Sequence, residues 1–275
     1  MPLLRLRFGV LMLLLSALSA LAAWENDEVW VHKRDTIPRK FGNGHESREL
    51  RRESFAWKGG VLDLDPGENG GLAVDGWDRD SISLVSRVQT YGSSDQAARE
   101  LATKLKVTRS GGTVRTEGPP QERSSHWAIT FHLMVPRGAS IRGHVINGPV
   151  EMSDIHGTVD LEGQNGPLSL EGVGGDVHAR MENGPVNVDL DGEKWDGKGL
   201  DVSTQNGPVN VTVPHGYSAQ LITGTINGPR IMKLEGRGFS RSNRWNTFTL
   251  GKGGATVKVV TTNGPAMVRY GRKPI

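Results

Sequence analysis

In the second half of the chain, apolar and polar residues alternate in short runs that return at a nearly regular spacing. Runs such as VNVDL at 186–190 and VNVTV at 209–213 place Val or Leu at every second position, which is typical of strands with one buried face. The tripeptide Asn-Gly-Pro precedes such runs, and its six copies start at successive intervals of 18, 18, 23, 21 and 36 residues. This repeat predicts stacked β-units, because one such unit cannot cover its own apolar face.

Each tripeptide is expected to form a corner between two strands. Asn and Gly tolerate the left-handed backbone region, whereas Pro fixes φ at about −65° and starts the next extended segment. Where corners stack, the Asn amides can hydrogen-bond from unit to unit and form a ladder. The alternative is a ligand-binding strip of Asn side chains. The predicted corner residues are Asn147, Gly148, Pro149, Asn165, Gly166, Pro167, Asn183, Gly184, Pro185, Asn206, Gly207, Pro208, Asn227, Gly228, Pro229, Asn263, Gly264 and Pro265.

The predicted fold class is all-β, with one short helix in the N-terminal part. Residues 141–270 are expected to form a β-solenoid of roughly 18-residue coils with Asn-Gly-Pro corners. Glycines between the tripeptides divide each coil into at least two strands. The last interval of 36 residues is twice 18, which predicts a degenerate coil around Trp245-Asn246.

Residues 55–140 are expected to form an N-terminal β-segment that caps the coils or contributes the first of them. One helix is predicted at 94–105, because a Ser-Ser-Asp start precedes Ala97, Leu101 and Leu105 at four-residue spacing. Alternating apolar runs predict strands at 61–65, 72–78, 81–90, 105–108, 113–116 and 127–135.

The N-terminus predicts export. Arg5 and Arg7 precede an apolar run, and a small-residue cleavage site follows, so residues 1–22 are predicted to be a signal peptide. Residues 23–54 are rich in charge and poor in apolar side chains, which predicts a flexible leader, and residues 271–275 form a tail. The chain has no cysteine, which favours the periplasm or surface of a bacterium over a disulfide-stapled secreted domain. No membrane span is expected after cleavage.

Charge is distributed unevenly along the repeats. Residues 147–201 hold 12 Asp and Glu against three Lys and Arg, whereas residues 230–275 hold ten Lys and Arg against one Glu. One interpretation is that charged strand faces prevent aggregation. The other is that the basic end contacts envelope polysaccharide, an anionic lipid surface or another envelope protein. Nucleic acid is not an expected partner of an exported chain. The candidate anionic-ligand patch is Arg230, Lys233, Arg237, Arg241 and Arg244.

Signals for catalysis, metals and cofactors are weak. The eight histidines lack the spacing of zinc ligands, and phosphate-cradling loops and dinucleotide fingerprints are absent, so no cofactor or metal is expected. Carboxylates on one solenoid face could still act in pairs, as in glycoside hydrolases. The candidate carboxylates are Asp154, Asp160, Glu162, Glu171, Asp176, Glu182, Asp189 and Asp191.

Several segments in a fixed order carry a resemblance to a known family. They are GWDRDSI at 76–82, KVTRSGGTVR at 106–115, MVPRGASI at 134–141 and the NGPV, GTVDLEGQNGPLSL and GGDVHARMENGPVNV repeats that follow. Over roughly residues 55–270 the chain resembles the bacterial putative-adhesin family of β-repeat proteins, the toast-rack type of domain of unknown function. The resemblance implies an exported or surface-displayed β-solenoid without an established enzymatic activity, and it supplies no catalytic residues.

The sequence therefore predicts an exported, non-enzymatic cell-envelope protein that acts as an adhesin-like binding or scaffolding module. The alternative is a β-helix carbohydrate-active enzyme, a lyase or glycosidase, that uses carboxylates on one solenoid face. A cleft lined by paired carboxylates and aromatic side chains would favour the enzyme, whereas a smooth polar face with a basic end would favour the binding module.

Overall fold

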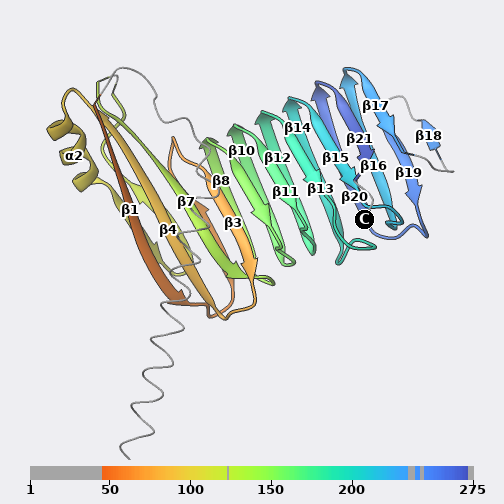
Figure 1. Cartoon of the computed structure of the whole chain (residues 1–275), viewed down its shortest axis with the longest axis horizontal. Coiled ribbons are helices and arrows are strands. Elements are labelled where there is room, and N and C mark those ends of the chain that lie inside the picture. Colours follow the sequence, from red (N-terminus) through yellow and green to blue (C-terminus); the bar gives the residue numbers. More distant parts are fainter. Residues whose placement is uncertain (1–44, 123, 235–238, 242–244, 272–275) are drawn as a thin grey trace, which may run out of the picture. The chain divides into compact units, whose positions relative to one another are not determined.

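The computed structural model describes residues 45–122, 124–234, 239–241 and 245–271, with backbone only for 239–241 (Figure 1). The chain divides into two units, Met1–Asn43 and Gly44–Ile275, and every described residue belongs to the second. The predicted signal peptide, leader residues 23–44 and tail residues 272–275 lie outside the described residues.

The all-β prediction is confirmed for the described residues, whose strands form two large sheets that are not closed. The first sheet contains, in spatial order, β1 (His45–Ala56), β4 (Ser81–Gly92), β7 (His126–Pro136), β3 (Leu72–Trp77), β9 (Val150–Ser153), β11 (Leu168–Glu171), β13 (Val186–Asp189), β15 (Val209–Val213), β21 (Ala266–Tyr270) and β17 (Arg230–Lys233). The second contains β18 (Phe239–Arg241), β19 (Asn246–Leu250), β16 (Ala219–Asn227), β20 (Thr256–Asn263), β14 (Gly199–Asn206), β12 (Asp176–Asn183), β10 (Thr158–Asn165), β8 (Ser140–Asn147), β2 (Val61–Asp65), β6 (Thr113–Glu117) and β5 (Lys106–Ser110).

Each Asn-Gly-Pro tripeptide joins a longer strand of the second sheet to a shorter strand of the first. Neighbouring units pair in parallel and in register, so that Val159 lies beside Val177 and Leu168 beside Val186. These four side chains are buried between the sheets. The repeat region thus owes its core to stacking of identical positions, which places surface residues in rows as well (Figure 1).

The C-terminal units stack out of sequence order. The unit formed by β20 and β21 lies between the β14–β15 unit and the β16–β17 unit. The prediction of a degenerate coil around Trp245-Asn246 is wrong, because β19 pairs antiparallel with β16 and forms no further parallel unit. Gly251 and Gly253 have φ values of 51° and 75° in the turn that reverses the chain from β19 into β20. Glycine adopts such values without a side-chain clash.

The leader prediction is wrong for residues 45–54, which form most of the 12-residue strand β1. This strand pairs antiparallel with β4 along its whole length and lies at the edge of the first sheet. Its charges pair within the strand, with Arg48 Nε 2.6 Å from Glu46 Oε1 and Arg51 Nε 2.9 Å from Glu49 Oε1. Edge strands often carry charge because it discourages pairing with other chains. The charged composition of residues 45–54 is therefore compatible with an edge strand as well as with a flexible leader.

The helix prediction is confirmed as α2 (Asp95–Lys104), with Ser94 as its N-cap. The Ser94 hydroxyl accepts a hydrogen bond from the Ala97 backbone N–H at 3.1 Å. At the other end, the Arg51 guanidinium donates to the carbonyl oxygens of Leu105 at 2.7 Å and Ala102 at 2.8 Å. These bonds add donors to carbonyl groups at the helix C-terminus, where the Ala102 oxygen also accepts from the Leu105 backbone N–H at 3.3 Å, and they tie α2 to β1.

Candidate functional site

The corner asparagines form one continuous side-chain ladder. Each amide Nδ2 donates to the Oδ1 of the next asparagine along the stack, and all bonds run in the same direction. The bonds are Asn147 to Asn69 at 3.2 Å, Asn165 to Asn147 at 2.9 Å, Asn183 to Asn165 at 3.0 Å, Asn206 to Asn183 at 2.9 Å, Asn263 to Asn206 at 2.8 Å and Asn227 to Asn263 at 2.8 Å. Because the amides satisfy one another, the ladder is well suited to fastening the units together.

Asn69 belongs to this ladder, although it is not among the predicted corner residues. It begins Asn69-Gly70-Gly71, which has Gly where the later tripeptides have Pro, and it bridges to Asn147. Gly70 N–H donates to the Asn147 carbonyl oxygen at 2.9 Å, as a corner of the stack requires. An Asn-Gly pair followed by the alternating residues Leu72 and Val74 was the signal that could have revealed it.

The corner glycines stack more tightly than a side chain would permit. A Cβ added to Gly166 would collide with the carbonyl oxygen of Gly148, and one added to Gly184 would collide with that of Gly166. A Cβ added to Gly207 would likewise collide with the carbonyl oxygen of Gly184. Glycine is therefore needed at these corners for close approach of backbones as well as for its φ values.

We expect Asn183→Ala to destabilise the protein about twice as much as Asn227→Ala. Asn183 donates one ladder bond and accepts another, whereas Asn227 makes only a donated bond among the described residues. At about 1 kcal/mol for each bond, the losses are about 2 and about 1 kcal/mol. Urea unfolding of both variants measures the difference. Equal losses would show that the amides act independently of their place in the ladder.

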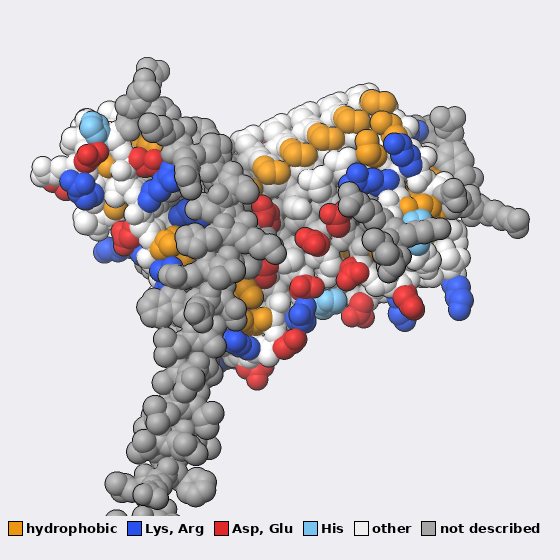
Figure 2. Space-filling view, viewed as in Figure 1, with side chains coloured by type: hydrophobic (Ala, Val, Ile, Leu, Met, Phe, Trp, Pro, Cys, Tyr) orange, Lys and Arg blue, Asp and Glu red, His pale blue; other side chains and the backbone are white. Residues whose placement is uncertain are grey.

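The outer face of the first sheet presents three straight rows of side chains over β11, β13, β15, β21 and β17. Leu168 and Leu170 are buried, so Pro167, Ser169 and Glu171 point outward. The proline row is Pro167, Pro185, Pro208, Pro265 and Pro229; the middle row is Ser169, Asn187, Asn210, Met267 and Ile231; and the charged row is Glu171, Asp189, Thr212, Arg269 and Lys233. Figure 2 shows a straight line of apolar side chains across the repeats, with acidic side chains below it and basic ones toward one end.

The charged row is segregated by sign. Glu171 and Asp189 are neighbours in register, Thr212 follows, and Arg269 and Lys233 are neighbours beyond it. All four charged side chains are exposed, and none makes an ion pair within the described ranges. Adjacent like charges on strands about 4.8 Å apart repel one another, so this row does not neutralise itself.

The outward row on the second sheet has the opposite organisation. Along this row, which we call the alternating row, Asp63, Arg142 and Asp160 alternate in sign, and Lys258 Nζ lies 3.0 Å from Asp201 Oδ2. Opposite charges on neighbouring strands attract each other, so acidic and basic side chains are mixed along this row instead of being segregated. Its members, in register order, are Asp63, Arg142, Asp160, His178, Asp201 and Lys258.

The structure brings part of the predicted anionic-ligand patch to one edge. Arg230 and Lys233 lie in β17, and Arg230 Nη2 donates to the Thr225 carbonyl oxygen at 2.7 Å. Arg241 lies in β18, but its side chain is outside the described part of the structure. Arg237 and Arg244 lie wholly outside the described residues. The register adds Arg269 beside Lys233. We refer to Arg230, Lys233 and Arg269 as the basic end.

The candidate carboxylates do not gather in a cleft. Of the eight, Glu171 and Asp189 are neighbours on the exposed charged row, and Asp176 binds Lys198 at 2.9 Å. The Lys198 ammonium lowers the pKa of Asp176 through this hydrogen bond. A cleft at the opposite end of the sheets is lined by residues that include Phe55, Trp57 and Arg109, and it contains none of the eight.

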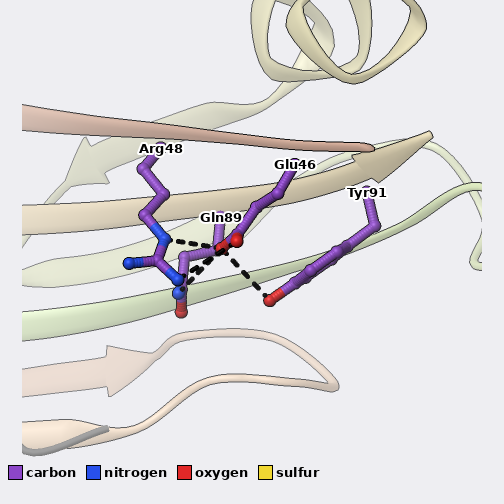
Figure 3. Close-up of polar contacts among 4 residues, drawn as sticks. All are labelled: Glu46, Arg48, Gln89 and Tyr91. Carbon is purple, nitrogen blue, oxygen red and sulfur yellow. Dashed lines mark hydrogen bonds and ion pairs between the residues drawn. The ribbon is translucent and has the colours of Figure 1, made fainter. Parts of the chain in front are cut away.

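A second polar cluster lies where β1 pairs with β4 (Figure 3). The Glu46 carboxylate accepts hydrogen bonds from Arg48 Nε at 2.6 Å, the Tyr91 hydroxyl at 3.3 Å and Gln89 Nε2 at 3.5 Å. Burial, and then the charge of Glu46, raises the pKa of Tyr91. The members satisfy one another, so the cluster fastens the edge strand to the sheet.

No three His, Asp or Glu side chains of the described segments are grouped as ligands for a metal ion. In the same segments, no helix is long and apolar enough to cross a membrane.

No protein-family profile and no curated protein matches the sequence. Three bacterial structures are similar over most of the chain. The first is a putative cell adhesion protein from Clostridium sporogenes, 10% identical, with a TM-score of 0.42 over 81% of this chain and 100% of that one. The second is a putative adhesin from Bacteroides fragilis, 14% identical, with a TM-score of 0.33 over 82% and 98%. The third is a putative lipid binding protein from Parabacteroides distasonis, 12% identical, with a TM-score of 0.29 over 83% and 98%. Similarities of this size carry no argument about ligand or activity.

Proposed function

We propose that residues 23–275 form an exported, non-enzymatic protein of a bacterial cell envelope, in which an adhesin-like β-solenoid binds an anionic surface through its basic end. The observation that carries the proposal is the adjacency of Lys233 and Arg269, both exposed and both without an ion pair among the described residues. Arg230 lies in the same edge strand as Lys233. Two adjacent cations on the outer face, with Arg230 on the other side of the same edge strand, create a positive potential at this end of the sheet that an anionic polymer or headgroup layer would neutralise.

The proposed solenoid explains how cations distant in the sequence act together. Lys233 and Arg269 come from different repeat units, and parallel in-register stacking makes them neighbours. The tight corners and the asparagine ladder hold this spacing, so the charges are presented on a preorganised edge. Export by the predicted signal peptide, residues 1–22, would deliver the edge to the periplasm or cell surface, where acidic polysaccharides and anionic lipids are the proposed ligands.

Binding to vesicles with and without anionic lipid, and to acidic and neutral polysaccharides, tests the proposal at low and moderate salt. The test variant replaces Arg230, Lys233 and Arg269 with Gln, and the matched control replaces the exposed Lys58, Arg99 and Lys104 with Gln. At about 1 kcal/mol for each cation near an anionic surface, we expect about 100-fold weaker binding for the test variant. Salt should weaken binding of the unmodified chain.

The vesicle assay and the polysaccharide assay show which of the two ligands, anionic lipid or acidic polysaccharide, the protein binds. Binding that is insensitive to salt, or an equal loss in the test and control variants, would contradict the assignment of the basic end. A third variant with Gln at Arg237, Arg241 and Arg244 extends the test to the predicted patch residues whose side chains are outside the described part.

A further inference from the structure

The charged row is antisymmetric about its centre. Thr212 of β15 is the middle position, with two acidic residues on successive strands on one side and two basic residues on successive strands on the other. Any two positions that lie equally far from Thr212 on its two sides therefore carry opposite charges. A row with this property is complementary to a copy of itself turned end for end.

We propose that two copies of this chain pack face to face through the outer faces of their first sheets, related by a two-fold axis that runs along β15. Such an axis reverses the order of the strands and keeps their direction. It places Glu171 opposite the partner copy's equivalent of Lys233, and Asp189 opposite the equivalent of Arg269. Each contact occurs twice, as an isologous interface requires.

The other two rows are compatible with this packing because they carry no charge over the five strands. The same axis places Pro208 on its own equivalent and brings the two proline rows together. In the middle row, Asn210 meets its equivalent, and Ile231, which is 37% exposed, would lie against Ser169. The charged row therefore gains four opposite-charge contacts, and no unpaired charge is buried beneath the other two rows.

The size of the face predicts a weak dimer. Five strands about 4.8 Å apart and about five residues of about 3.3 Å each give a flat face of roughly 400 Å² for each copy. That area is at the low end of transient interfaces, and exposed ion pairs contribute little each. The dimer should therefore form at high protein concentration and dissociate as salt screens its charges.

This dimer goes beyond the proposed anion binding and does not depend on it. Asp189 and Glu171 lie outside the basic end, so variants at these positions disturb the dimer and leave the proposed anion-binding cations in place. If both proposals hold, an anionic ligand competes with the second copy for Lys233 and Arg269.

Charge reversal provides the test. Sedimentation velocity at about 1 mM protein and low salt would detect even a dimer with a Kd of about 1 mM, which then holds about half of the chains. We expect Asp189→Arg alone and Arg269→Asp alone to be monomeric, because each places like charges opposite each other twice. An equimolar mixture of the two variants should form a heterodimer, in which both contacts join opposite charges, and the double variant should dimerise again.

The alternating row on the second sheet offers a matched control. Asp160 and Arg142 are exposed neighbours in register, so Asp160→Arg and Arg142→Asp change net charge by the same amounts as the test variants. Each control variant should dimerise like the unmodified chain, and thermal unfolding checks that all variants are folded. A monomeric unmodified chain, unchanged dimerisation of Asp189→Arg, or the same heterodimer gain in the control mixture would overturn the proposal.

Discussion

Replacement of Gly166 with Ala is expected to destabilise the repeat region by about 3 kcal/mol, because the new methyl group would collide with the carbonyl oxygen of Gly148. That carbonyl belongs to the backbone of the neighbouring corner, so relief requires the two units to separate. The φ of 144° at Gly166 adds strain for any L-residue. For a domain of this size, the loss corresponds to a decrease in Tm of about 6–12 °C, measured by thermal unfolding.

Gly138→Ala is the matched control for this prediction. A Cβ at Gly138 meets no atom within 4 Å, and its φ is not in the region that disfavours L-residues. We expect its Tm to stay within about 2 °C of the unmodified protein, since surface substitutions usually change stability by less than about 0.5 kcal/mol. Equal Tm values for the two variants would refute the claim that corner glycines are required for close stacking.

Arg51→Ala is expected to destabilise the protein by about 2 kcal/mol. The change removes two charge-assisted hydrogen bonds, to the carbonyl oxygens of Leu105 and Ala102, and leaves both groups at a helix C-terminus without that donor. It also removes the ion pair with Glu49. Denaturant unfolding gives the loss, and hydrogen exchange should show faster opening of α2.

Two further variants define the origin of this effect. Arg51→Lys should recover only part of the stability, because an ammonium group lacks the fork that lets a guanidinium reach two carbonyls. Arg99→Ala removes an exposed arginine of α2 and should have little effect. Full recovery by Lys, or an equal loss at Arg99, would show that charge alone explains the contribution of Arg51.

Local signals in the sequence predicted the regular part of the fold. Alternation around Val186 and Val209 placed strands correctly, and the Ser94 start placed α2, because these patterns depend on neighbouring residues only. The order of stacking depends on which units meet in space. Nothing near Thr256 indicates that β20 pairs with both β14 and β16, so the interleaved order could not be predicted.

The edge strand β1 was missed for a related reason. Its twelve residues alternate little in hydrophobicity, because an edge strand has fewer neighbours to bury it and carries charge that discourages association. This segment is a strand because it pairs with β4, which begins more than 20 residues later in the chain.

The candidate site was predictable in composition but not in arrangement. The excess of basic residues after Arg230 is visible in the sequence. The adjacency of Lys233 and Arg269, which are 36 residues apart, comes from the register of β17 with β21. Strand register also decides which charged residues fall in the charged row of the first sheet and which fall in the alternating row of the second. The order of these residues in the sequence does not show to which row each belongs.

The proposed function requires that the protein bind an anionic envelope component without altering it. Residues 23–275 would be incubated with acidic and neutral envelope polysaccharides, and both the bound fraction and the mass of every glycan would be measured. We expect salt-sensitive binding of acidic glycans, weakened by Gln at Arg230, Lys233 and Arg269, with every glycan recovered intact. Cleavage of any glycan would contradict the non-enzymatic proposal and direct attention to Glu171 and Asp189 as a catalytic pair.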